Sequence, residues 1–80
     1  MLTIEYRDSF LKAVSKVRDG TTKERIKKQI AKILKDPDIG KPMRYVRRGT
    51  RELYVGSYRP AYSHSKNKIV FLDVYHKNGQ

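Results

Sequence analysis

The sequence contains no cysteine, and only 8 of its 80 residues are acidic. Without cysteine the chain can form no disulfide, thiolate nucleophile or zinc–thiolate site, so packing alone must stabilise the fold. No apolar run approaches the roughly 20 residues needed to span a bilayer, and the N-terminus lacks the basic-then-apolar pattern of a signal peptide. We therefore expect a soluble cytoplasmic protein without membrane association.

Cofactor motifs are missing as well. We find no metal-ligand cluster, no phosphate-cradling glycine loop and no nucleophile elbow, so we expect neither a metal nor a small-molecule cofactor. Hydrophobic residues make up 38% of the chain and charged residues 34%. At this length that composition supports one modest core, so residues 1–80 should form a single domain.

Basic residues dominate the charge. The 19 Lys and Arg residues exceed the acidic residues by 11, and residues 41–80 hold 9 basic against 2 acidic side chains. A field this strong on a small domain favours a polyanionic partner, either nucleic acid or the ribosome, or else an acidic protein. The alternative is a solvated basic surface that only aids solubility.

One strand and two helices are predicted in the first half. Residues 2–6 alternate as a half-buried strand does, with Leu2, Ile4 and Tyr6 facing the core. Residues 9–18 repeat apolar side chains at helical spacing, with Asp8 or Ser9 as the cap.

A second helix should begin at a capping box. Thr21 and Glu24 have its spacing, and Pro37 ends the helix because proline disfavours helical conformation in the preceding residue. Since the link is short, the two helices should form an antiparallel hairpin whose apolar side needs a sheet to cover.

The second half predicts consecutive antiparallel strands at 51–56, 58–64 and 68–75, joined by tight turns. Residues 39–42 read as a loop, and residues 43–48 alternate weakly and are a further candidate strand. Pro60 cannot donate to a ladder, so we expect it at an edge or a bulge. The predicted fold is α+β in the order β-α-α-β-β-β, with a helical hairpin on one face of a small twisted, mainly antiparallel sheet.

Alternation assigns faces to the strand residues. Tyr58 and Tyr62 should fill the core, while Arg59, Ala61 and Ser63 point to the other face, where the two small residues leave room for a ribose-phosphate. The predicted core between helices and sheet comprises Phe10, Val14, Ile30, Ile33, Val70 and Leu72.

Three segments carry a family resemblance. Gly40-Lys41-Pro42-Met43-Arg44 is followed by Val55-Gly56-Ser57-Tyr58-Arg59-Pro60-Ala61-Tyr62 and by Asp73-Val74-Tyr75-His76-Lys77. Together with the element order, these residues resemble the RelE/ParE superfamily of toxins over nearly the whole chain. The resemblance implies a type II toxin that is neutralised by an antitoxin wrapped around it. RelE-type members cleave mRNA in the ribosomal A site, whereas ParE-type members inhibit DNA gyrase.

The resemblance also points to site residues. Arg59 would clamp a phosphate, His76 would transfer a proton, Lys77 would stabilise the transition state and Glu52 could act as a base. RelE-type toxins place basic residues two apart on the strand before Tyr58-Arg59, where this chain has Glu52 and Tyr54. The RNA-binding candidates are Arg44, Arg47, Arg48, Arg51 and Tyr54.

Each of these residues has a plain structural alternative. Arg59 could pair with Asp73, His76 could be an exposed residue near the terminus, Lys77 one more solvated lysine, and Glu52 a partner of Arg51 or Arg44. Three functions therefore remain open: a metal-independent, ribosome-dependent mRNA endoribonuclease held silent by an acidic antitoxin, a gyrase-directed toxin, and a basic RNA- or ribosome-binding module.

Overall fold

The computed structural model describes residues 2–42 and 49–77. The elements follow the order β1 (Thr3–Tyr6), α1 (Asp8–Ser15), α2 (Gly20–Lys35), β2 (Lys41–Pro42), β3 (Thr50–Glu52), β4 (Tyr58–Ser65) and β5 (Lys68–His76). The candidate strand at 43–48 lies outside the described residues. None of the described helices has the length and apolar character to cross a membrane.

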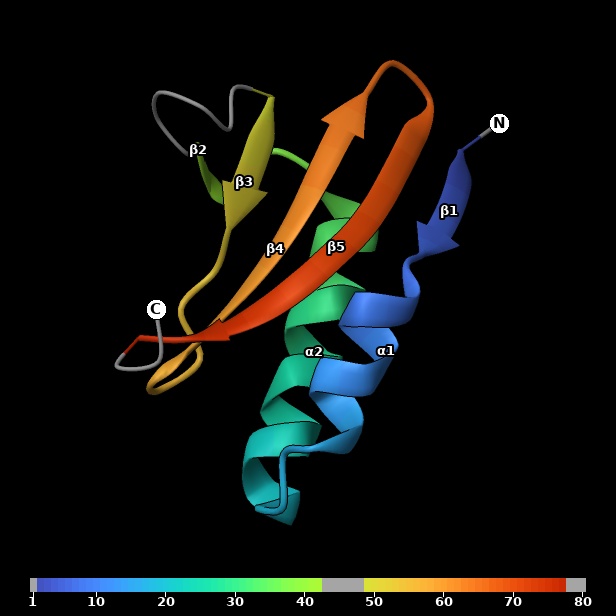
Figure 1. Ribbon diagram of the computed structural model, residues 1–80. Helices are drawn as coiled ribbons and strands as arrows, with labels where there is room; N and C mark the ends of the chain where they lie inside the picture. The colour runs from blue at the N-terminus through green and yellow to red at the C-terminus, as the bar shows by residue number, and fades with distance from the viewer. Residues whose placement is uncertain (1, 43–48, 78–80) are drawn as a thin grey trace.

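The strands form one mixed five-stranded sheet in the order β1-β5-β4-β3-β2. β1 runs parallel to β5, and every other neighbouring pair is antiparallel. Figure 1 shows β4 and β5 as a long hairpin with β1 beside β5. The predicted α+β architecture is confirmed. β2 is an addition, because we expected a loop there, and the strand expected at 51–56 ends at Glu52.

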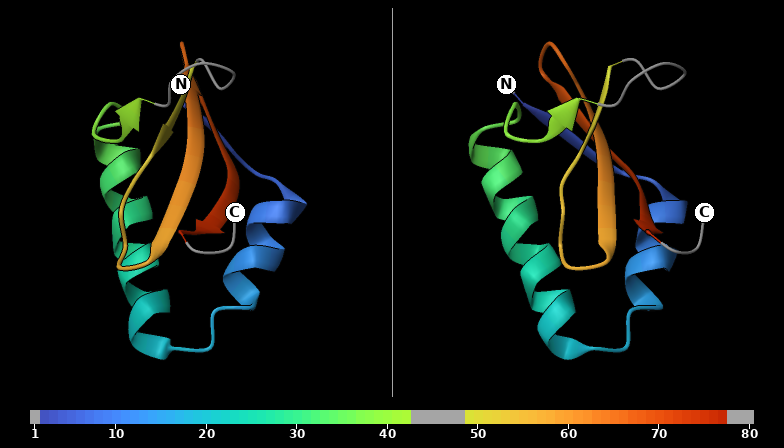
Figure 2. Two further views of the ribbon diagram at one scale, coloured as in Figure 1. Left: turned by 60° about the vertical axis from the view of Figure 1, so that its left-hand side comes forward. Right: turned by 90° about the vertical axis from the view of Figure 1, so that its left-hand side faces the viewer.

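The helices are antiparallel and joined by the short link 16–19 (Figure 2). Their caps differ from the expected ones. Arg7 precedes α1 without a side-chain cap. Asp19 caps α2 by accepting from the Thr21 amide and the Thr22 hydroxyl, so Thr21 is not the cap. The Thr22 bond, followed by the Thr21 bond, lowers the pKa of the Asp19 carboxyl.

Both helices contribute to two buried clusters. Phe10 of α1 and Ile33 of α2 are buried against sheet residues Tyr62, Ile69 and Phe71, with Val14 and Ile30 packed alongside. The second buried cluster joins the helical hairpin to the chain before β4: Val17, Ile26 and Val55. Tyr58 packs against this second cluster, so the expected core placement of both Tyr58 and Tyr62 is correct.

A register shift changes which side of β5 enters the core. Ala61 pairs with Asp73 but Tyr62 pairs with Phe71, which leaves Leu72 as an extra residue. The cluster between helices and sheet therefore receives Ile69, Phe71 and Val74. Val70 is buried, as predicted, but does not belong to this cluster, and the predicted core position of Leu72 is wrong. The shift directly follows Pro60, whose missing N–H we expected to place it at an edge or a bulge.

β1 is less buried than its alternation predicted. It lies at the sheet edge and pairs with β5 alone, so Leu2, Ile4 and Tyr6 stay 37%, 40% and 41% exposed. Tyr6 nevertheless stacks on Phe71, with ring centroids 5.0 Å apart and planes 12° apart. Because β1 has a neighbouring strand on one side only, these three apolar side chains stay partly exposed to solvent.

Candidate functional site

A loop between α2 and β2 is fastened to the core by Tyr62. The Tyr62 hydroxyl donates to the Pro37 carbonyl at 2.6 Å and accepts from the Gly40 amide at 3.0 Å. Burial is the main cause of the raised pKa of this phenol. The loop end that leads into β2 and Lys41 is therefore held at a fixed place beside β3.

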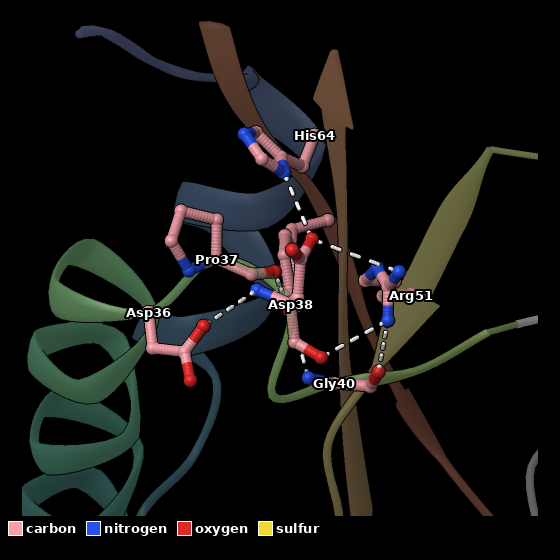
Figure 3. Close-up of polar contacts among 7 residues, drawn as sticks. Asp36, Pro37, Asp38, Gly40, Arg51 and His64 are labelled. Atoms are coloured by element: carbon pink, nitrogen blue, oxygen red, sulfur yellow. Dashed lines mark hydrogen bonds and ion pairs between the residues drawn. The ribbon is translucent and has the colours of Figure 1, made fainter. Parts of the chain in front are cut away.

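Arg51 fastens the same loop from β3 (Figure 3). Its Nη1 donates to the carbonyls of Asp38 and Gly40 at 3.1 and 2.8 Å, and its Nη2 lies 3.6 Å from the Asp38 carboxylate. His64 Nδ1 lies 3.1 Å from the same carboxylate oxygen. Arg51, a predicted RNA-binding residue, thus has its guanidinium engaged in holding the loop, and His64 contacts the same loop through Asp38.

The sheet face opposite the helices, called the open face below, carries the candidate site. Directly paired strand residues share a face. Arg51 pairs with buried Tyr62 and belongs to the helix side, whereas Glu52 pairs with Ala61, which pairs with Asp73. Arg59, two residues before Ala61, lies on the open face together with Glu52.

Arg59 is held by two kinds of contact. Its Nη1 donates to the carbonyls of Gly56 and Tyr58 at 2.8 and 2.9 Å, and its guanidinium carbon lies 4.1 Å from the centre of the Tyr54 ring. Within the described residues it forms no ion pair with Asp73, whose carboxylate accepts from the Val74 amide. A planar cation stacked on an aromatic ring and bonded to carbonyls has little freedom left, so its direction is set before any ligand arrives.

A shallow groove of about 230 Å³ borders the Tyr54 ring. Its lining residues come from β2, β3 and the chain next to them: Ile39, Lys41, Glu52, Leu53 and Tyr54. Lys41 pairs with Glu52 across β2 and β3, and its Nζ lies 6.0 Å from the centre of the Tyr54 ring. The ring itself is 55% exposed, which leaves a stacking surface open to solvent.

The space expected over Ala61 is filled. Ala61 is 0% exposed although it faces away from the helices, so neighbouring side chains cover the position that we expected to admit a ribose-phosphate. The accessible region of the open face near Arg59 is instead the Tyr54 groove.

His76 and Lys77 lie away from Arg59. His76 pairs with Tyr58 and contacts its ring edge-on at 5.1 Å, whereas Arg59 pairs with Tyr75, so the His76 and Arg59 side chains point to opposite faces. His76 lines a separate groove of about 430 Å³ beside α1, with Lys12, Lys16 and Val74 among its neighbours. The Lys77 amide donates to the Ser57 carbonyl at 2.8 Å, beyond the end of β5.

The structure therefore gathers only part of the predicted set. Glu52, Tyr54 and Arg59 share the open face, His76 and Arg51 face the helix side, and Arg44, Arg47 and Arg48 lie outside the described residues. Sequence reasoning missed Lys41 as a site residue, although the Gly40-Lys41-Pro42 motif contained it. Among the described residues no cluster of three His, Asp or Glu side chains is placed to hold a metal.

Comparison with known proteins places the chain in a family. Residues 4–80 match the family described as the ParE toxin of type II toxin–antitoxin systems, parDE. No curated protein matches the sequence significantly.

Solved structures share the fold at low identity. The RelBE2 toxin–antitoxin complex of Mycobacterium tuberculosis aligns with a TM-score of 0.79 and 22% identity over 94% of this chain and 96% of the other. The intact RelBE toxin–antitoxin complex of Escherichia coli gives 0.78 and 20% over 95% and 96%. YafQ from Escherichia coli gives 0.76 and 16% over 98% and 96%.

The family match covers nearly the whole chain, and the two helices and mixed sheet agree with these folds. The chain therefore belongs to the RelE/ParE superfamily of type II toxin–antitoxin toxins.

Proposed function

We propose that this toxin binds mRNA at the ribosome with the open face of its sheet and cleaves it without a metal ion. The observation that carries the proposal is the Arg59 guanidinium, held by Tyr54 and two carbonyls on that face. Nη1 donates to the two carbonyls. The other edge of the guanidinium, formed by Nε and Nη2, can therefore donate two parallel N–H bonds to a phosphate. Structural similarity to RelE-type toxins supports the same assignment.

RNA cleavage of this kind needs three things from the protein. The 2′-hydroxyl must lose a proton and attack phosphorus, the leaving 5′-oxygen must gain a proton, and the extra charge on the phosphorane must be neutralised. The products are a 2′,3′-cyclic phosphate and a 5′-hydroxyl end. Arg59 supplies the neutralising charge, and Glu52 is the carboxylate that can take the 2′-hydroxyl proton because it shares the open face with Arg59.

His76 and Lys77 receive a smaller part in this proposal. The His76 side chain faces the groove beside α1 and contacts Tyr58, so it cannot reach a phosphate that Arg59 holds from the opposite face. We therefore assign proton transfer to Glu52, and the leaving oxygen takes its proton from water. His76→Ala should leave most cleavage intact, whereas Glu52→Gln should remove most of it.

The proposal includes an acidic antitoxin as partner. Structures similar to this chain were solved as toxin–antitoxin complexes. The formal charge of +11 favours a partner of opposite sign. Such a partner would keep a toxic activity silent in the cytoplasm of the producing cell.

Induced expression of wild-type toxin and of Arg59→Ala, followed by mapping of mRNA ends at ribosomes, tests the proposal. Wild type should produce ribosome-dependent cuts with 5′-hydroxyl ends, and Arg59→Ala should lower cleavage roughly 100- to 1,000-fold because it loses a transition-state contact. The matched control is Arg18→Ala, which removes the same charge from an exposed position on the link between the helices. Growth arrest by Arg59→Ala equal to wild type would remove the nuclease function.

Inhibition of DNA gyrase is the second candidate. The matching family is described as ParE, and Glu52 and Tyr54 occupy positions where RelE-type toxins place basic residues. A supercoiling assay with purified gyrase separates the candidates, because a gyrase-directed toxin should block supercoiling without cutting mRNA. A toxin that does neither but still binds ribosomes would be the basic binding module.

A further inference from the structure

We infer that the groove beside Tyr54 is a nucleotide subsite, in which a base stacks on Tyr54 while Lys41 contacts its phosphate. This inference rests on the proposed action on RNA, and it assigns Lys41, Ile39 and Leu53 a part in it. The occupant is the nucleotide next to the phosphate that Arg59 holds.

Two cations, Arg59 and Lys41, lie near the Tyr54 ring. Arg59 stacks on the ring at 4.1 Å but does not line the groove, whereas Lys41 lines the groove and lies 6.0 Å from the ring centre. A half-exposed aromatic ring with two cations near it fits a chain that alternates planar bases with negative charges. Base–aromatic stacking tolerates any base because each base has a π-face.

The walls of the groove suit a base better than they suit an ion alone. Ile39 is 39% exposed and Tyr54 is 55% exposed, so both offer apolar area that gains from being covered. Leu53 completes the apolar lining, and Lys41 and Glu52 add one charge of each sign. An acceptor such as Glu52 can bond to the amino or ring N–H groups of a base, and Lys41 can bind its phosphate.

The local fold keeps this groove in shape. Tyr62 and Arg51 fix the loop just before β2, and β2 pairs Lys41 directly with Glu52. Ile39 and Lys41 thus approach Tyr54 from a segment whose position depends on buried contacts. The groove does not need to be assembled by its ligand, which lowers the ordering cost of binding.

Binding of a trinucleotide that cannot be cleaved tests the subsite. The probe is a fluorescein-labelled 2′-O-methyl trinucleotide, and its partner probe lacks the bases but keeps the phosphates. Fluorescence polarisation is measured for wild type, Tyr54→Ala, Lys41→Ala and Lys28→Ala, the last being an exposed lysine on α2. Far-UV circular dichroism and a thermal scan check that each variant is folded.

Tyr54→Ala should weaken binding of the intact probe roughly tenfold, because base stacking is lost. It should weaken binding of the abasic probe less, because that probe loses only the support that the ring gives to Arg59. Lys41→Ala should weaken both probes several-fold and reduce the dependence of log K on log salt by about 0.7, the value for one phosphate contact on a single strand. Lys28→Ala should match wild type.

Equal losses on both probes for Tyr54→Ala, or equal effects of Lys41→Ala and Lys28→Ala, would overturn the subsite. So would binding of an acidic peptide at this groove with no binding of either probe. Cleavage of mRNA by a toxin that fails these tests would leave the proposed function standing without the subsite. The predicted binding pattern in a toxin that cuts no mRNA would instead remove the nuclease function and keep the subsite.

Discussion

Gly40 and Tyr62 meet so closely that no side chain fits between them. The Gly40 amide donates a 3.0 Å hydrogen bond to the Tyr62 hydroxyl. A Cβ atom built on Gly40 would lie 2.6 Å from that oxygen and 3.0 Å from Cβ of Arg51. The family-like Gly40-Lys41-Pro42 segment therefore needs glycine because of space, and this contact sets where β2 begins.

Gly40→Ala should destabilise the protein by about 1–3 kcal/mol, as added atoms in packed interiors do. The free energy of unfolding from urea denaturation measures the loss. Gly20→Ala is the matched control, because a Cβ there would meet nothing within 4 Å and Gly20 is the first residue of α2. The control should be neutral or slightly stabilising. Equal stability of the two variants would show that Tyr62 can move away from the loop.

Tyr62→Phe should reveal a pH-dependent part of the stability. Burial raises the pKa of the Tyr62 phenol in the folded protein, so above about pH 10 the unfolded chain releases a proton that the folded protein retains. The contribution of the hydroxyl is thus fully present below pH 10 and declines as pH rises above it. Wild type should exceed Tyr62→Phe by about 1–3 kcal/mol at pH 7, and the difference should shrink by pH 11. Urea unfolding at both pH values checks this, and a difference independent of pH would contradict the raised pKa.

Local pattern predicted the helices, the β4–β5 hairpin and the mainly antiparallel sheet. It failed in β5, where one extra residue shifts the pairing with β4. The extra residue at Leu72 exchanges the faces of β5 beyond it. Strict alternation therefore assigned Val70 and Leu72, in place of Ile69 and Phe71, to the face that packs against the helices. A bulge is a property of two paired strands, and a single strand's alternation cannot show it.

The sequence predicted which residues form the candidate site better than it predicted where their side chains lie. Arg59 was singled out by its motif, but its stacking on Tyr54 depends on how the chain turns between β3 and β4. His76 was expected to transfer a proton in the reaction at the phosphate that Arg59 clamps, but the pairing of His76 with Tyr58 places it on the other face. Arg51 was expected to bind RNA, and a loop 11 to 13 residues earlier engages it. These outcomes follow from pairing partners that the sequence does not specify.

Ile33→Ala should cost about 2–5 kcal/mol, because Ile33 is 0% exposed and packs with Phe10, Tyr62 and Phe71. Thermal or urea unfolding monitors the effect. Leu11→Ala is the control on the other helix, and with Leu11 51% exposed it should change stability little. A midpoint for Ile33→Ala near that of the control would contradict the register of α2.

Binding of the acidic antitoxin should weaken as salt rises. The reason is the charge of +11 on one small domain, because salt screens interactions between exposed charges. Titration calorimetry with the cognate antitoxin, at about 50 and about 500 mM salt, provides the measurement. An affinity that does not change with salt would mean that apolar contacts dominate the complex.

Arg59→Lys should fail almost as completely as Arg59→Ala, although it keeps the charge. A lysine ammonium cannot stack flat on Tyr54, bond to the carbonyls of Gly56 and Tyr58 and still offer two parallel donors to a phosphate. Ribosome-dependent cleavage should therefore fall nearly as far as the roughly 100- to 1,000-fold expected of Arg59→Ala. The unfolding midpoint should stay close to wild type because Arg59 is only half-buried. Tyr54→Phe is the matched variant: it keeps the ring that supports the guanidinium and should retain most cleavage. Full activity of Arg59→Lys would show that charge alone suffices, and the fixed guanidinium would then lose its role in the mechanism.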